Sequence, residues 1–239
     1  MNICPAVVLT LKNTACLLAK YFLKILLFLR AGIVLKMSQE CGLLKFDRHL
    51  SEILSIKATS EGNVGINSLR LFLKLLEYSG HGIPWIIATL YVIFKNPDLE
   101  TRLFFCNLLM ALIIDLAIVG CLKTLIRRPR PVYNADDMFA TVSVDRYSFP
   151  SGHSTRVVMV AMLFTCYWTN NFYVRLGFIW AAMVAISRVV LGRHHVSDVI
   201  GGILIGYLQY SVVLKYWLKR ESLEQIFDEL IINWIERIG

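Results

Sequence analysis

The chain lacks the cysteine pattern of a disulfide-rich or zinc-binding protein. Its 239 residues include six cysteines, and no two of them form a Cys-x-x-Cys pair. Most of them lie in apolar runs, where cysteine behaves as a small hydrophobic residue. We therefore expect neither a disulfide framework nor a structural metal site. The cysteines are Cys4, Cys16, Cys41, Cys106, Cys121 and Cys166.

The alternation of apolar and polar residues that marks β-strands is also missing, as are internal repeats and low-complexity tracts. Instead, 56% of the residues are hydrophobic and the mean hydropathy is +0.59. Crossing a bilayer takes roughly 20 apolar residues, with about 17 tolerated, and helices satisfy the backbone there. We predict an all-α polytopic membrane bundle with about five transmembrane helices plus N-terminal interfacial helices. The five spans are Tyr78–Phe94, Leu103–Leu122, Ser154–Trp168, Leu176–Leu191 and Val199–Leu214.

Acidic residues are few: 17 Asp and Glu stand against 25 Lys and Arg, for a formal net charge of +8. A basic chain often binds nucleic acid, but here the basic residues gather at the ends of apolar segments. Anionic lipid headgroups and phosphorylated substrates explain that placement better. The expected partners are therefore the bilayer and a lipid phosphate within it, and no nucleic acid.

Residues 1–37 form a basic, apolar N-terminal segment. Four cations, Lys12, Lys20, Lys24 and Arg30, fall on one side of a helix and face away from Leu, Phe and Ile. This pattern favours an interfacial helix lying in the membrane surface. A membrane span and a cleaved targeting segment remain the alternatives, although central lysines disfavour both.

The rest of the chain divides into three parts. Residues 38–77 are mixed and amphipathic, with Glu77 on the polar face of their last helix, and we expect them to lie along the membrane surface. Residues 78–218 hold the five spans and form the membrane domain. Residues 219–239 form an amphipathic C-terminal tail.

Three separated clusters of cationic and histidine residues carry the chemistry. The first reads Lys123-x6-Arg130-Pro131 and follows the second predicted span. Arginine offers a planar fork to two phosphate oxygens and lysine acts as a point charge, so Lys123 and Arg130 are candidate phosphate ligands. A patch for anionic lipid is the alternative, and it stays open for Arg127 and Arg128.

The second cluster, Pro150-Ser151-Gly152-His153, precedes the third predicted span. The start of a helix binds anions through its unpaired N–H groups and its dipole. Ser151 can cap that helix and contact an oxygen, and Gly152 lets the backbone approach a phosphate closely. His153 is then placed to protonate a leaving oxygen as a general acid. A plain serine cap with an interfacial histidine is the alternative.

The third cluster contains Ser187-Arg188, His194 and Asp198. Arg188 supplies a third fixed cation. If helical phasing holds, His194 and Asp198 share one face, so that the carboxylate orients the imidazole. An oriented imidazole can attack phosphorus and form a phosphohistidine that water then hydrolyses. The neighbouring His195 breaks the spacing and is not assigned this role.

Metal-binding patterns are incomplete. The pair His194-His195 has no further His or Cys at a spacing suited to zinc. The pair Asp136-Asp137 continues as Met138-Phe139-Ala140, so it does not make an Asp-Asp-x-x-Asp magnesium motif. Since three fixed cations can neutralise a phosphate, we expect no metal and no cofactor.

Asp115 lies inside the second predicted span. An intramembrane carboxylate is a functional-site hypothesis by default. Pairing with a neighbouring helix through Asn107 or through a Ser or Tyr hydroxyl is the alternative.

Taken together, Lys-x6-Arg-Pro, Pro-Ser-Gly-His and Ser-Arg-x5-His-x3-Asp resemble the three-part signature of the type 2 phosphatidic acid phosphatase family, and they match it at every signature position between residues 123 and 198. The resemblance implies a membrane enzyme that removes phosphate from lipids without a metal. It assigns His153 as acid, His194 as nucleophile and Asp198 as the residue that orients it. The phosphate ligands that it implies are Lys123, Arg130, Ser151, Gly152 and Arg188.

Flanking segments at residues 76–85, 134–139 and 143–153 resemble one subgroup of that family, the polyisoprenoid diphosphate/phosphate phosphohydrolases, or presqualene diphosphate phosphatases. This likeness implies farnesyl, geranylgeranyl and presqualene diphosphates as substrates, some activity on phosphatidic acid, and a place in the endoplasmic reticulum and nuclear envelope. A broader phosphatidic acid or sphingoid-base phosphate phosphatase, a lipid phosphotransferase and a non-enzymatic scaffold are the alternatives.

The number of spans also predicts the topology. Two spans separate residues 123–153 from His194, so both lie on one side of the membrane. The tail after Lys215 lies on the other side, and Lys219 and Arg220 favour the cytosol for it. The catalytic residues would then face the lumen.

Overall fold

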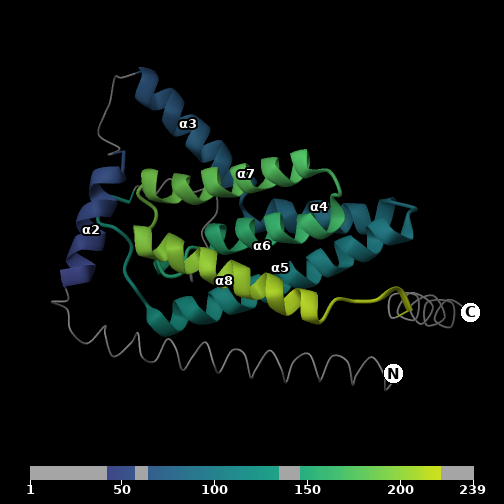
Figure 1. Ribbon diagram of the computed structural model, residues 1–239. Coiled ribbons are helices and arrows are strands. Elements are labelled where there is room, and N and C mark those ends of the chain that lie inside the picture. Colours follow the sequence, from purple (N-terminus) through teal and green to yellow (C-terminus); the bar gives the residue numbers. More distant parts are fainter. Residues whose placement is uncertain (1–41, 57–63, 135–145, 222–239) are drawn as a thin grey trace, which may run out of the picture.

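The computed structural model describes residues 42–56, 64–134 and 146–221, and within them it contains seven α-helices and no β-strand (Figure 1). The predicted all-α class is therefore confirmed. The N-terminal segment 1–37, the pair Asp136-Asp137 and most of the C-terminal tail lie outside the described residues. The helices are α2 (Gly42–Leu54), α3 (Val64–Ser79), α4 (Gly82–Lys95), α5 (Leu99–Ile126), α6 (Gly152–Tyr167), α7 (Asn171–Val190) and α8 (Val196–Lys215).

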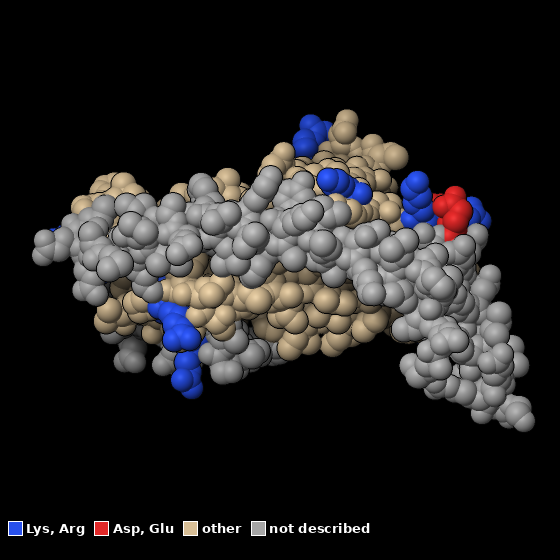
Figure 2. Space-filling view, turned by 90° about the horizontal axis from the view of Figure 1, so that it is seen from below, with Lys and Arg blue, Asp and Glu red and all other residues tan. Residues whose placement is uncertain are grey.

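The five predicted spans correspond to helices α4 to α8. Three of them, α5, α7 and α8, are long and apolar enough to cross a membrane. The other two, α4 and α6, have 14 and 16 residues. Large apolar side chains are exposed on the longer helices, such as Ile113 and Leu116 on α5 and Ile186 on α7. Figure 2 shows a face on which wide areas of the described surface carry no Lys, Arg, Asp or Glu, as lipid contact requires.

Side-chain caps set several helix starts. The Asp98 carboxylate accepts a hydrogen bond from Thr101 N at 2.8 Å, which fixes the beginning of α5. Asn170 caps α7 in the same way through Phe172 N, also at 2.8 Å. At the other end of α5, Arg127 adopts the left-handed conformation with φ of 50°, and the helix stops there.

Helix α6 forms the centre of the bundle, and α8 approaches it closely. A Cβ atom at Gly206 would stand 2.4 Å from the carbonyl oxygen of Thr155, and one at Gly202 would stand 2.8 Å from that of Ser151. No larger residue fits at either position while the backbones keep this distance. The two glycines therefore hold the start of α8 against the start of α6, where two of the three clusters lie.

Asp115 pairs across the bundle with α6. Its Oδ2 lies 2.9 Å from Arg156 Nη2, and its Oδ1 accepts a hydrogen bond from Thr155 Oγ1 at 2.7 Å. Asn107, by contrast, binds the backbone of Leu218. Breaking a buried ion pair by removing one partner costs about 3–5 kcal/mol, so Asp115 ties α5 to α6.

In Figure 1, the C-terminal ends of α5 and α7 and the N-terminal ends of α6 and α8 lie at the same end of the bundle, and α2 lies across that end. Val196 N donates to Ser51 Oγ of α2 at 2.9 Å. Helix α3 contacts α7 and ends beside the start of α4. We call this end of the bundle, where all three clusters lie, the active-site end.

Candidate active site

Hydrogen bonds to backbone carbonyl oxygens join the three clusters. Ser151 N donates to the carbonyl oxygen of Asp198 at 3.1 Å, which links the second cluster to the third. Arg130 Nη1 lies 3.5 Å from the carbonyl oxygen of Arg193, which links the first cluster to the third. Segments as far apart in sequence as residues 123 and 198 therefore build one site.

The candidate phosphate ligands come from four different elements. Lys123 lies in the last turn of α5 and Arg188 in the last turn of α7, and both side chains are buried. Arg130 lies on the loop after α5 and is half-buried. Ser151 is the N-cap of α6, its Oγ accepting from Ser154 Oγ at 2.9 Å. Gly152, the first residue of α6, packs so closely on Val119 that an added Cβ would come within 3.3 Å.

His194 lies in the short loop between α7 and α8 and is 2% exposed. Its Nδ1 lies 2.8 Å from the carbonyl oxygen of Ser148, which can only accept, so Nδ1 carries the proton and Nε2 is the basic nitrogen. Burial, followed by the charges of the three cationic phosphate ligands, holds the pKa of His194 well below its usual value. The imidazole is therefore neutral at physiological pH, as a nucleophile must be.

Asp198 does not form the expected hydrogen bond with His194. Helix α8 begins at Val196, so His194 precedes it and does not share a helical face with Asp198. The distance from Asp198 Oδ2 to His194 Nδ1 is 4.0 Å. Asp198 Oδ2 instead accepts from His195 N at 2.8 Å and lies 3.1 Å from His195 Nδ1. The carboxylate thus organises the start of α8 and acts on His194 by its charge.

Arg128 is held by two carboxylates. Its guanidinium lies 2.6 Å from Asp198 Oδ1 and 2.6 Å from Asp47 Oδ2 on α2. Asp47 also accepts from Ser197 N at 3.0 Å. Burial raises the pKa of Asp47, but the bonds from Ser197 and Arg128 outweigh it, so the pKa lies below its usual value. Arg128 is therefore not lipid-facing, and α2 belongs to the structure of the site.

Glu77, expected on a polar surface face, is buried at the active-site end. Its Oε1 lies 2.7 Å from Arg188 Nη1, and its Oε2 lies 3.5 Å from Arg193 Nη2. Burial raises its pKa, but the two arginines outweigh that effect and hold the pKa below the usual value. Glu77 is the one acidic residue of α3 and stands in an apolar run, which is the sequence signal that could have revealed its burial.

His153 follows Gly152 in the first turn of α6. Its Nε2 is buried and has no hydrogen-bond partner among the described residues. The His153 ring stands edge-on to that of His81, with centroids 5.7 Å apart. His81 is half-buried at the start of α4. Gly80, next to it, packs so closely that a Cβ there would stand 3.4 Å from the His153 ring.

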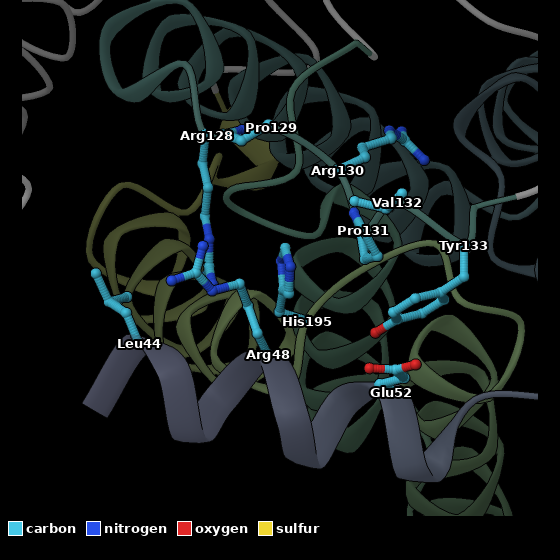
Figure 3. Close-up of a pocket in the computed structure, with 10 residues that line it drawn as sticks. All are labelled: Leu44, Arg48, Glu52, Arg128, Pro129, Arg130, Pro131, Val132, Tyr133 and His195. Carbon is cyan, nitrogen blue, oxygen red and sulfur yellow. The ribbon is translucent and has the colours of Figure 1, made fainter. Parts of the chain in front are cut away.

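A cavity of about 730 Å³ lies beside this site, between α2 and the loop after α5 (Figure 3). Arg48 extends into it from α2, Arg128 reaches it from the loop after α5, and His195 reaches it from the start of α8. Burial, with the nearby carboxylate of Glu52, raises the pKa of Tyr133 to about 12, so this phenol stays a donor. The other lining residues are Leu44, Pro129, Arg130, Pro131 and Val132. Arg130 and His195 connect the cavity to the buried residues around His194.

Known proteins resemble this chain in sequence and in fold. A model of the PAP2 superfamily matches residues 104–222. The probable lipid phosphate phosphatase beta of Arabidopsis thaliana is 36% identical over 158 residues, which cover 55% of this chain and 70% of that protein. The undecaprenyl-diphosphatase of Sulfolobus acidocaldarius is 29% identical over 191 residues, covering 78% of this chain and 85% of that protein.

The fold is similar to the crystal structure of a transmembrane PAP2-type phosphatidylglycerolphosphate phosphatase from Bacillus subtilis. The TM-score is 0.56 at 23% sequence identity, over 80% of this chain and 94% of that one. The resemblance to the type 2 phosphatidic acid phosphatases is thereby confirmed at the level of the family. The apolar helices, the three clusters at one end of the bundle and these relatives lead to one conclusion: the chain belongs to the PAP2 superfamily and is a membrane phosphatase.

Proposed function

We propose that this enzyme hydrolyses membrane lipid phosphates and diphosphates, with isoprenoid diphosphates such as farnesyl, geranylgeranyl or presqualene diphosphate as preferred substrates. The observation that carries the proposal is the environment of His194. A buried neutral imidazole, held through Nδ1 by a backbone carbonyl, stands among three cations at the ends of apolar helices. That arrangement suits attack on a phosphate at the membrane surface.

In the proposed mechanism, His194 Nε2 attacks the terminal phosphorus and the bond from phosphorus to the leaving oxygen breaks. His153 gives its proton to that oxygen, and the lipid alcohol or lipid monophosphate leaves. Water then attacks the phosphohistidine and gives a proton to His153, the bond from phosphorus to His194 Nε2 breaks, and orthophosphate leaves, so both histidines return to their starting states. Lys123, Arg130 and Arg188 offset the charge on the phosphoryl oxygens, which is where most catalysis of phosphoryl transfer arises. These fixed cations make a divalent ion unnecessary.

The depth of the site supports an amphiphilic substrate. The phosphate ligands lie at helix ends, so a bound phosphate sits at headgroup level while its hydrocarbon stays in the lipid. Each buried CH₂ contributes about 0.8 kcal/mol, which favours a lipid over a soluble phosphate.

The cavity beside α2 supports a diphosphate. By charge alone, Arg127, Arg128 and Arg146, which lie between α5 and α6, are candidate ligands of a second phosphate. However, Arg128 is held by two carboxylates, and Arg127 Nε donates to the carbonyl oxygen of Thr124 at 2.8 Å. Arg48, which extends into the cavity from α2, is better placed to receive the second phosphate (Figure 3). We therefore assign that role to Arg48.

Mixed-micelle assays test the substrate proposal. Farnesyl diphosphate should be hydrolysed with a higher kcat/KM than phosphatidic acid or sphingosine 1-phosphate, and the monophosphate should be released first and cleaved more slowly. Arg48→Gln should lower kcat/KM for the diphosphate about tenfold, the scale of one lost charge-assisted hydrogen bond, and leave that for the monophosphate unchanged. Lys45→Gln, a nearby change on α2, is the control. Phosphatidic acid being turned over tenfold more efficiently than farnesyl diphosphate would refute the assignment.

We also propose that the enzyme resides in the endoplasmic reticulum and nuclear envelope with its active-site end in the lumen. Lys215, at the opposite end of α8, and the following Lys219 and Arg220 favour the cytosol. Protease treatment of sealed microsomes tests this orientation. A C-terminal epitope should be digested, and protection of that epitope would reverse the proposed topology.

A further inference from the structure

Glu77 is a buried carboxylate that bridges two buried arginines. Glu77 comes from the last turn of α3, Arg188 lies in the last turn of α7, and Arg193 lies in the loop that carries His194. Glu77 is 5% exposed, and neither arginine has measurable exposure. One carboxylate oxygen lies 2.7 Å from Arg188 and the other lies 3.5 Å from Arg193. The three side chains form what we call the Glu77 bridge.

Electrostatics explains why a carboxylate stands at this place. An unpaired buried cation is strongly destabilising because it loses its hydration. The charges of Arg188, Lys123 and Arg130 all act on His194, and Arg193 directly precedes His194 in the chain. Glu77 offsets one positive charge of this group. It also holds the Arg188 guanidinium in one orientation before any ligand is bound, so that little reorganisation is needed when a phosphate enters.

The same charge has a second consequence, which concerns the product. Orthophosphate carries the same phosphoryl oxygens that the enzyme recognises in its substrate, and it must leave after each turnover. Since the affinity of a cationic pocket for an anion rises with the net charge of the pocket, a carboxylate beside Arg188 weakens the retention of orthophosphate. Strong binding of substrate and product alike would lower KM without raising kcat.

We propose that Glu77 is a positioning residue that sets the orientation of Arg188 and Arg193 and limits how tightly the site retains orthophosphate. The inference rests on the proposed role of Arg188 as a phosphate ligand. Helix α3 lies outside the three clusters, yet through Glu77 it contributes to the balance between phosphate binding and phosphate release.

Inhibition of the purified full-length enzyme by orthophosphate and by vanadate tests the inference. Glu77→Gln keeps the size of the side chain and an oxygen that accepts from Arg188, but it removes the charge. The inhibition constants for both anions should fall about tenfold, the scale of one unit charge near a partly screened site. Both kcat and KM for the lipid substrate should fall together, because product leaves more slowly.

Two further variants separate charge from shape. Glu77→Asp keeps the charge on a shorter side chain, so the inhibition constants should stay within about twofold of wild type while kcat falls. Glu100→Gln removes the same charge from the exposed start of α5 and should change neither the inhibition constants nor kcat. Melting temperatures in detergent show whether each variant is folded.

If Glu77→Gln alone does not fold, removing the charge of Arg193 together with that of Glu77 provides a second test. In the double variant Glu77→Gln/Arg193→Gln the net charge is that of wild type, and in Arg193→Gln alone it is lower by one. The inhibition constant for orthophosphate should therefore be about tenfold lower in the double variant than in Arg193→Gln. A higher inhibition constant in either Glu77→Gln comparison would overturn the inference, since a purely structural role predicts loosened ligands and weaker binding.

These outcomes are distinct from failure of the proposed function. If wild-type protein bound neither vanadate nor orthophosphate and released no phosphate from any lipid, the phosphate site itself would be refuted. If wild type binds both anions and the Glu77→Gln variants bind them more weakly, the phosphate site stands and the role of Glu77 is overturned.

Discussion

Replacing Asp198 by asparagine tests how this carboxylate acts on His194. Asp198 Oδ2 lies 4.0 Å from His194 Nδ1, whereas the Ser148 carbonyl oxygen lies 2.8 Å from the same nitrogen. In Ser-His-Asp enzymes, where the carboxylate itself holds the tautomer, the equivalent change lowers kcat about 10⁴-fold. Here a backbone carbonyl holds the tautomer, and the substitution leaves it in place. We therefore expect a smaller loss.

The distance sets the size of that loss. Two unit charges 4 Å apart interact by about 4 kcal/mol at an effective dielectric constant of about 20. Arg128, 2.6 Å from Asp198 Oδ1, offsets much of the field of the carboxylate at His194. We take the part of the Asp198–His194 charge interaction that Arg128 does not offset to be about 1.4–2.7 kcal/mol. Losing it in Asp198→Asn should lower the rate of forming the cationic phosphohistidine about 10- to 100-fold.

Rapid quenching of phosphoenzyme formation, expressed per folded enzyme, measures this rate. Asp47→Asn is the matched control, because it removes the other carboxylate from Arg128 and no described contact joins Asp47 to His194. Both substitutions should lower the melting temperature, but Asp47→Asn should slow phosphorylation less than tenfold. A 10⁴-fold loss in folded Asp198→Asn would refute the reasoning and indicate a direct Asp198–His194 hydrogen bond during turnover.

Three further predictions concern the chemistry. His194→Ala should abolish turnover and the acid-labile phosphoenzyme, while His195→Ala should still form it; the reverse pattern would move the nucleophile to His195. Hydrolysis should continue in excess EDTA and be inhibited by vanadate, and strict dependence on added magnesium would contradict the role given to the fixed cations. Because the pKa of His194 is depressed and protonation would remove the nucleophile, activity should persist below the usual histidine pKa of about 6.5 and be lost only at lower pH. A fall in kcat/KM centred at pH 6.5 or above would contradict that environment.

The sequence alone determined that this is a helical membrane protein, and it identified the enzyme family. Apolar runs long enough to cross a bilayer need no tertiary information, because the surrounding lipid imposes the helix on each of them. The three clusters could be recognised for a similar reason: each is a short local pattern beside a helix end. Because helices α6 and α7 return the chain to the end it left, the clusters meet at one place.

The detailed partners of His194 depended on the tertiary structure. The four-residue spacing to Asp198 suggested a shared helical face, but α8 begins only at Val196, so that phasing does not apply. The hydrogen-bond partner is the carbonyl oxygen of Ser148, 46 residues away in sequence. A backbone carbonyl is present at every residue, so no side-chain pattern could single it out.

Glu77 and Asp47 show the same limit for charged groups. Each lies on a helix that reads as amphipathic, where a carboxylate is expected to face water. Each is instead turned inward by arginines that lie far away in sequence: Arg188 and Arg193 for Glu77, and Arg128 for Asp47. The sequence determined which side chains carry charge. Only the packing of α2 and α3 against the bundle decided which of these charges meet. The physical reason is that a buried charge needs a partner, and the fold supplies it from a distant segment of the chain.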